Sequence, residues 1–310
     1  MADTGPGTVS GRKPEWLRMK LASGEVFENV AGLLARHRLH TVCTSARCPN
    51  LSECWNRGTA TFMILGETCT RHCGFCSVKT GNPHREVDED EPQRVAQAAR
   101  ELGLRYVVLT SVDRDDLEDL GSGMFAHTVT ALKRPADSSV AARPQNNRGP
   151  VGLPRVEVLT PDFGARKEPV QKVVEAGPDV FGHNIETVER LSPEVRDRRA
   201  SYRTSLEVLC LVKELRPGML TKSGLMAGLG ETDEEVERAL HDLRAAGCDI
   251  VTIGQYLQPD RRCLPVQRYV EPSQFEKWHE EAQGMGFRAA LCGPLVRSSY
   301  LAESVLAESC

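Results

Sequence analysis

The sequence predicts a wound α/β fold that forms an incomplete barrel, and three observations support this prediction. From residue 60 onward, short β-rich runs alternate with segments of helical period, as they do in βαβ units with a parallel sheet. With 310 residues and 40% hydrophobic content, the chain can bury one large core. No internal repeat divides it. We therefore expect one barrel with short extensions.

Six or seven runs have the length and composition of buried strands. They cover residues 60–66, 106–111, 156–160, 180–184, 221–228 and 250–256, with 287–292 as the seventh. Helix signals separate them. Thr232 and Glu235 form a capping box, and Gly247 can supply the left-handed stop of the same helix. Ser273 and Glu276 repeat the capping pattern farther along the chain.

The chain divides into three parts. Residues 1–58 form an N-terminal extension, residues 59–294 the barrel and residues 295–310 a C-terminal segment. Residues 133–154 contain four prolines and little apolar content, which predicts an exposed insertion in the barrel. The acidic residues 86–91 are typical of a solvated loop.

Composition narrows the class of protein. A formal net charge of -4 gives no broad attraction to phosphate backbones or anionic lipids, so we expect neither nucleic acid nor a membrane as a partner. No apolar run has the length of a membrane span, and the first 15 residues lack the hydrophobic region of a secretory signal. The prediction is a cytoplasmic protein.

The cysteines are unevenly distributed. Six of the eleven lie between Cys43 and Cys76, where a uniform distribution would place roughly one. In an intracellular chain such clustering indicates metal or catalytic thiols rather than a disulfide framework. The other five cysteines fit no motif, and buried or terminal thiols explain them.

Cys69, Cys73 and Cys76 have the spacing Cys-x3-Cys-x2-Cys directly after a predicted strand. Three thiolates on one short loop suit three irons of a [4Fe-4S] cluster, and the fourth iron is left open for a small molecule. The alternative is half of a zinc site. That site needs a fourth ligand, and His72, between two of the cysteines, is poorly placed to supply it.

The motif CTRHCGFC resembles the signature of the radical S-adenosylmethionine (SAM) superfamily. The resemblance implies a partial (β/α)6 TIM-like barrel whose open iron binds the amino and carboxylate groups of SAM. It also implies SAM contacts at the carboxyl ends of other strands. These contacts would come from Ser111, Asp113, Asn184 and Glu186, and from Gly228 in a stretch that resembles the superfamily's Gly-x-Ile-x-Gly-x-x-Glu. The alternative for each residue is a strand-end turn or a helix cap.

A second triplet, Cys43, Cys48 and Cys54, precedes the barrel with the spacing Cys-x4-Cys-x5-Cys. It implies a second cluster with one iron that no cysteine serves. Structural disulfides do not account for it, because three is an odd number and the compartment is reducing.

Together with RSSY at residues 297–300, the two triplets resemble the lipoyl synthase family, and the likeness runs from about residue 16 to 300. In that family a serine of RSSY ligates the fourth iron of the auxiliary cluster, and by position we choose Ser299 over Ser298. Two departures stand out: the insertion at 133–154 is longer than the usual connection, and Cys263 stands where we expect histidine.

The resemblance implies a radical SAM sulfurtransferase. An electron on the cluster of the first triplet would cleave SAM to a 5'-deoxyadenosyl radical, which abstracts hydrogen from C6 and then C8 of an octanoyl group on a lysine. The auxiliary cluster would give up its sulfur. The implied partners are lipoyl carrier domains (2-oxoacid dehydrogenase E2 subunits and the glycine cleavage H protein), an electron donor such as ferredoxin or flavodoxin, and an iron-sulfur carrier that rebuilds the cluster.

Other functions stay open at this point. Biotin synthases lack the upstream triplet, and tRNA methylthiotransferases usually carry a basic RNA-binding domain that is missing here. A third class is a non-catalytic zinc-binding interaction module, which would be colourless.

Overall fold

The computed structural model describes residues 13–18, 25–42, 50, 53–55, 59–135 and 152–299. Cys43 and Cys48 lie outside the described residues, as do residues 136–151, which make up most of the expected insertion.

Seven parallel strands form the main sheet. Their order is β2 (Thr59–Ile64), β5 (Tyr106–Ser111), β6 (Arg155–Leu159), β7 (Val180–Gly182), β8 (Leu220–Ala227), β9 (Ile250–Gln255) and β10 (Ala289–Gly293). The short strand β1 (His40–Thr41) pairs antiparallel with β2, so β1 and β10 are the two edges of an open barrel. All seven expected strands are confirmed, with ends that differ by a few residues.

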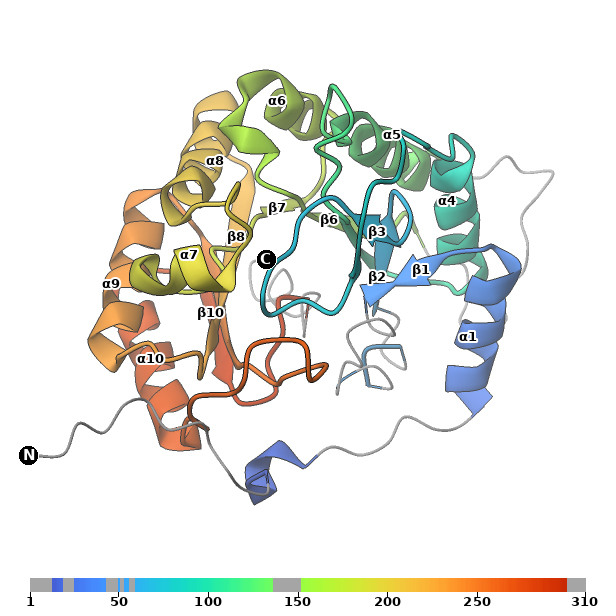
Figure 1. Ribbon diagram of the computed structural model, residues 1–310. Coiled ribbons are helices and arrows are strands. Elements are labelled where there is room, and N and C mark those ends of the chain that lie inside the picture. The colour runs from blue at the N-terminus through green and yellow to red at the C-terminus, as the bar shows by residue number, and fades with distance from the viewer. Residues whose placement is uncertain are drawn as a thin grey trace, which may run out of the picture.

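Helices cover the outside of the curved sheet (Figure 1). They are α1 (Glu25–Arg36), α4 (Glu91–Glu101), α5 (Ser122–Lys133), α6 (Lys167–Glu175), α8 (Tyr202–Leu215), α9 (Asp233–Ala245) and α10 (Pro272–Gly284). The short α7 (Ser192–Val195) lies inward of α8 and α9 in Figure 1. Strand and helix alternate along the chain from β5 to β10, and this confirms the predicted partial barrel. Within the described residues, no helix combines the length and apolar character of a bilayer span.

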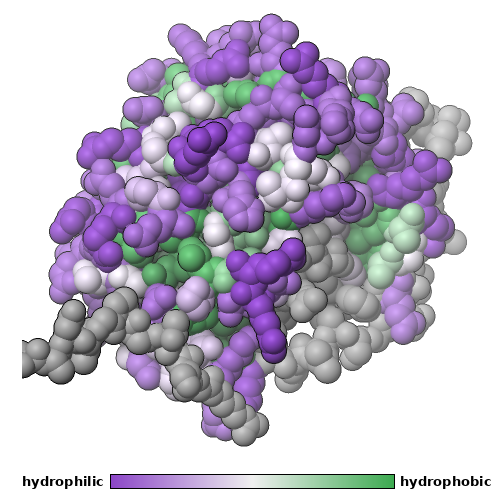
Figure 2. Space-filling model, viewed as in Figure 1, coloured by the Kyte–Doolittle hydropathy of each residue, from purple (hydrophilic) through white to green (hydrophobic). Residues whose placement is uncertain are grey.

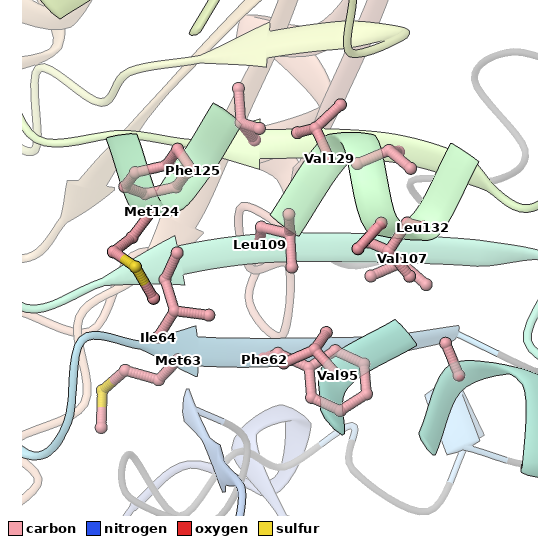
Figure 3. Close-up of a cluster of buried hydrophobic side chains, with 14 of the residues drawn as sticks. Phe62, Met63, Ile64, Val95, Val107, Leu109, Met124, Phe125, Val129 and Leu132 are labelled. Atoms are coloured by element: carbon pink, nitrogen blue, oxygen red, sulfur yellow. The ribbon is translucent and has the colours of Figure 1, made fainter. Parts of the chain in front are cut away.

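The core lies between the sheet and these helices. In Figure 3, side chains of β2 and β5 such as Phe62 and Leu109 face side chains of α4 and α5 such as Val95 and Phe125, and all four are at most 1% exposed. Each fully buried side chain of this size contributes about 1.5–3 kcal/mol. On the other side of the barrel, Trp278 of α10 is fully buried.

Two helix starts test the capping predictions. At α9, Thr232 Oγ1 accepts the Glu235 amide at 3.3 Å and the Glu235 carboxylate accepts the Thr232 amide at 2.9 Å, so the capping box is confirmed. Gly247 ends this helix with φ of 79°. The expected cap at Ser273 is wrong. α10 already begins at Pro272 without a side-chain cap, because proline has a helical φ and is favoured in the first turn.

One ion pair crosses the barrel interior. Lys222 of β8 and Glu157 of β6 are 3% and 2% exposed, and Nζ lies 2.9 Å from Oε1. Tyr106 of β5 donates its hydroxyl to Glu157 Oε2 at 2.7 Å. Three strands are thereby joined by a buried polar network.

Candidate active site

The first cysteine triplet lies on a loop after the carboxyl end of β2. Two short parallel strands, β3 (Thr68–Cys69) and β4 (Lys79–Thr80), close this loop, because Cys69 pairs with Thr80. Figure 1 shows the segment after β3 crossing in front of the barrel strands. The loop therefore covers the end of the barrel at which the parallel strands finish.

The cysteine sulfurs accept backbone N–H groups. Cys69 Sγ lies 3.4 Å from the amide of Arg71 and 3.3 Å from that of Asp113. Cys73 Sγ lies 3.3 Å from the amide of Asp197. Such donors stabilise a thiolate that binds iron. All three cysteines are free thiols, and burial raises the pKa of Cys69 and of Cys73 to about 12, so binding of metal must displace protons.

Neighbouring segments hold the loop on two sides. The Gly74 amide donates to Val195 O at 2.8 Å, and Gly74 O accepts the Leu264 amide at 2.8 Å. A Cβ at Gly74 would lie 2.9 Å from the Leu264 side chain and 3.4 Å from Glu194 O. A side chain at this position would therefore require the Leu264 side chain to shift.

Arg71, which was not predicted as a site residue, anchors the loop internally. The Arg71 guanidinium, 7% exposed, contacts Asp162 at 2.6 Å, Asp115 at 2.8 Å and Asp113 at 3.3 Å. Burial alone would raise the pKa of Asp162, but hydrogen bonds from Arg71 hold it below its usual value. A signal was available, since an arginine inside the cysteine motif and the acidic run DRDD at a strand end are complementary in charge.

A cavity of about 240 Å³ brings the triplet together with four of the predicted SAM contacts. Its lining includes Cys69, Cys73, Cys76, Ser111, Asp113, Asn184 and Glu186. The Ser111 hydroxyl is buried and has no partner among the described residues, so it can bond a ligand in this cavity. Arg196, which sequence reasoning also missed, adds a cation to the lining.

Glu186 lines the cavity and has a left-handed backbone conformation, which is rare for residues other than glycine. Its φ is 66°, and its backbone bonds Gly224 O at 3.0 Å and the Met226 amide at 2.9 Å. Asn184 Nδ2 donates to Glu186 Oε1 at 3.1 Å. Burial raises the pKa of Glu186, although the nearby Arg196 charge opposes the shift. Strained backbone of this kind occurs at binding sites, where it directs a side chain.

Gly228 lies outside the lining of the described cavities. Its φ is 100°, and a Cβ there would collide with the Gln255 side chain and lie 2.5 Å from Arg268 O. In the same stretch, Gly224 does line a cavity, and a Cβ on it would lie 2.5 Å from Thr252 Oγ1. Both positions therefore have no room for a side chain, and a SAM contact of Gly228 stays a prediction.

A second cavity of about 410 Å³ adjoins the first. Both are lined by Phe75, Cys76, Val78, Asn184 and Glu186. The second cavity continues past Tyr256, Leu257 and Pro259 to residues 296–298 of the C-terminal segment. In Figure 2, which shows the same face as Figure 1, hydrophobic residues are visible between the hydrophilic side chains inward of the helices.

The structure also brings part of the second cysteine motif close to the C-terminal segment. Asn50, four residues before Cys54, donates its side-chain amide to Leu295 O at 2.6 Å. Leu295 precedes Ser299 by four residues. Among the described residues, no three histidine, cysteine or acidic side chains gather closely enough to hold a single metal ion.

The residues around the first triplet fit an iron-sulfur cluster with SAM. The donors are thiols that already accept backbone N–H groups, and the cavity beside them contains an unpartnered hydroxyl and both carboxylate and guanidinium groups. SAM carries an amino group, a carboxylate and ribose hydroxyls, which such groups can bind.

Comparisons with known proteins agree with this arrangement. The model of the radical SAM superfamily matches residues 63–243, more than half of the chain. A lipoyl synthase of Halorhodospira halophila is 53% identical over 98% of this chain and 86% of its own length. A lipoyl synthase of Pyrobaculum calidifontis is 54% identical over 95% of this chain and 96% of its own.

Solved structures resemble the fold at low identity. The hydrogenase maturase HydG from Carboxydothermus hydrogenoformans superposes with a TM-score of 0.53 at 14% identity, covering 81% of this chain and 66% of that one. This likeness concerns the barrel alone. From the sequence matches, the chain belongs to the lipoyl synthase family of radical SAM enzymes.

Proposed function

We propose that this enzyme inserts sulfur at C6 and C8 of an octanoyl group bound to a lysine of a lipoyl carrier domain. One observation carries the proposal: the cavity of the three thiols shares a wall with a larger cavity that ends at the serine-bearing C-terminal segment. When bound, the first cluster supplies an electron that splits SAM to a 5'-deoxyadenosyl radical, and the second cluster supplies sulfur.

The chain's own residues bind and orient the reactants. Cys69, Cys73 and Cys76 hold the first cluster. Ser111, Asp113, Asn184 and Glu186 bind SAM in the smaller cavity, where each is a lining residue. Cys43, Cys48 and Cys54 with Ser299 hold the auxiliary cluster, and the contact of Asn50 with Leu295 supports this grouping.

The larger cavity takes the octanoyl chain. Its walls include Phe75, Val78, Leu257 and Val296, which suit an alkyl chain and exclude water from a carbon radical. Asn184 and Glu186 line both cavities, so they lie between the SAM site and the alkyl chain. A radical formed in one cavity therefore has a short path to the substrate in the other.

The test is turnover under anaerobic conditions. Reconstituted, reduced enzyme is incubated with SAM and an octanoyl-lysyl peptide, and mass spectrometry follows 6-thiolated and lipoylated peptide. Wild-type protein should give both. If neither product forms while both clusters are present, the proposed function is wrong.

Cysteine variants test the sulfur donor. Replacing Cys43, Cys48 or Cys54 with alanine should abolish sulfur insertion and leave 5'-deoxyadenosine formation intact. Cys210→Ala is the matched control, because Cys210 is exposed on α8 and belongs to neither triplet. Sulfur insertion by the triplet variants would exclude the auxiliary cluster as donor.

Iron analysis separates the alternatives. Two [4Fe-4S] clusters give about eight irons per chain and a brown colour, whereas a zinc-binding interaction module is colourless. Another radical SAM sulfur-inserting enzyme, of the biotin synthase or methylthiotransferase kind, would leave the octanoyl peptide unchanged.

We propose a cytoplasmic location for the enzyme. Its substrates would be E2 or H-protein carrier domains. Its other partners would be a ferredoxin or flavodoxin as electron donor and an iron-sulfur carrier that rebuilds the auxiliary cluster.

A further inference from the structure

We infer that Arg71 is a positioning residue that fixes Cys69 and Asp113 relative to each other and whose charge sets the reduction potential of the first cluster. The part that concerns the cluster rests on the proposed function. The geometry comes from the side chains alone.

All three nitrogens of the Arg71 guanidinium donate hydrogen bonds to carboxylates. Nη1 and Nη2 bond the two oxygens of Asp162 at 2.6 and 3.0 Å, which is a bidentate pair. On its other edge, Nη2 bonds Asp115 Oδ1 at 2.8 Å and Nε bonds Asp115 Oδ2 at 3.1 Å. The planar fork of arginine fits this pattern, while the single ammonium of lysine can serve only one side.

These contacts fix the loop against the strand ends. Asp115 follows β5 and Asp162 follows β6, so Arg71 connects the cysteine loop to two neighbouring strands of the barrel. Thr70 adds a second link, because its hydroxyl lies 2.6 Å from Asp115 Oδ2. The loop is thereby held where the strands end.

The same residue is bonded to a cysteine that holds the cluster. The Arg71 amide donates to Cys69 Sγ at 3.4 Å, and its Nε lies 3.3 Å from Asp113 Oδ1. The Asp113 amide donates to the same sulfur at 3.3 Å. A movement of Arg71 therefore disturbs both N–H groups that donate to the Cys69 sulfur. It also disturbs the carboxylate of Asp113, which we propose as a SAM contact.

Charge gives Arg71 a second effect. Four carboxylates, Asp113, Asp115, Asp162 and Asp197, surround the loop, and Arg71 shares their neutralisation with Arg199, which lies 3.2 Å from Asp115 and 2.8 Å from Asp197. Reduction adds an electron to the cluster. Loss of the Arg71 charge makes the surroundings more negative, which disfavours reduction and lowers the potential.

Two substitutions separate position from charge. Arg71→Met removes both the bidentate hydrogen bonds and the positive charge, while Arg71→Lys keeps the charge and loses the bidentate geometry. Arg198→Met is the matched control, since Arg198 is an exposed arginine of the adjoining α7–α8 segment and has no ion pair among the described residues.

The first measurement is an EPR-monitored redox titration of the holoenzyme, in which the signal that responds to SAM reports the first cluster. Arg71→Met should shift its midpoint to more negative potential, whereas Arg71→Lys and Arg198→Met should keep the wild-type value. The second measurement is alkylation of Cys69 in the metal-free chain. Both Arg71 variants should react at least about tenfold faster than Arg198→Met, because the loop opens more often.

The inference is overturned if Arg71→Met matches Arg198→Met in both potential and alkylation rate. Should Arg71→Met not fold, Arg71→Lys decides the positioning role by its alkylation rate. A wild-type holoenzyme without any SAM-responsive signal would instead contradict the proposed function, so the two failures are distinguishable.

Discussion

The contact between Asn50 and Leu295 gives a sharp prediction about the auxiliary cluster. It joins residues 245 positions apart, and the Asn50 side chain is only 7% exposed. One residue further on, Val296 O lies so near Gly254 that a Cβ there would collide with it. We expect Asn50 to hold the segment that carries Ser299 beside the second cysteine motif.

The magnitude follows from the lost bond. Asn50→Ala leaves the part-buried Leu295 carbonyl without this donor, which costs about 1–3 kcal/mol. Because each 1.4 kcal/mol is a factor of ten, the segment should open roughly 5- to 150-fold more often. Asn50→Asp should cost more than alanine, since a carboxylate oxygen would then face the carbonyl oxygen.

Hydrogen exchange of the metal-free chain measures this opening. Peptides that contain residues 295–299 should exchange faster in Asn50→Ala and faster still in Asn50→Asp. Asn82→Ala is the control, because it removes an exposed contact, the 2.8 Å bond to the His84 amide. Unchanged exchange in both Asn50 variants would show that Asn50 does not hold this segment.

The reconstituted enzyme gives an independent check. If Asn50 acts through Ser299, then Asn50→Ala combined with Ser299→Ala should lose no more sulfur insertion than Ser299→Ala alone. Additive losses would show that Asn50 acts elsewhere.

Three further predictions concern the barrel. Gly224→Ala should raise the KM for the octanoyl-lysyl peptide several-fold in a turnover assay, because its Cβ would lie 2.5 Å from Thr252 Oγ1 at the wall of the larger cavity; an unchanged KM would exclude this crowding. Lys222→Met should lower the free energy of unfolding by about 3–5 kcal/mol in urea, since Glu157 stays buried and uncompensated, and a smaller loss when Glu157→Gln is added would confirm the cause. Burial raises the pKa of Asp179, but hydrogen bonds from a backbone amide and two cations outweigh burial and lower this pKa. The contribution of Asp179 to stability is therefore present above about pH 4 and is lost as the pH falls through the folded-state pKa. Asp179→Asn should flatten the dependence of the metal-free chain's urea midpoint on pH below about pH 4, and a dependence equal to wild type would contradict this.

The sequence predicted the elements that depend on local pattern. Buried β-branched runs such as residues 250–255 are typical of interior strands of a parallel sheet, and the cap at Thr232 involves residues three apart. The predicted cap at Ser273 was wrong because the helix begins one residue earlier, at Pro272, and proline is favoured in the first helical turn.

Contacts between distant residues could not be predicted in the same way. Arg71 meets its carboxylates 44 and 91 positions away. The acidic run DRDD is complementary to Arg71 in charge, but nothing local to Arg71 indicates that this run and Asp162 fold against it. The glycine stretch shows the same limit. Its composition indicates that backbone must come close to something, but only the packed structure separates Gly228, which lies against Gln255 and Arg268, from Gly224, which faces a cavity.

The two proposed cluster sites differ in how the described residues support them, and the difference agrees with the roles proposed for them. Around Cys69 and Cys73 the sulfurs accept main-chain amides, and a buried guanidinium fixes the loop to two strands. A ligand set preorganised in this way favours a cluster that keeps its structure through repeated electron transfer. At the C-terminal segment, a side-chain amide holds the chain near a serine, whose oxygen is a harder and weaker ligand for iron than a thiolate. A site that must release sulfur and be rebuilt needs such a detachable ligand, so a variant that strengthens it, Ser299→Cys, should retain iron and slow sulfur insertion. Faster insertion by Ser299→Cys would argue that release of this ligand does not limit the reaction.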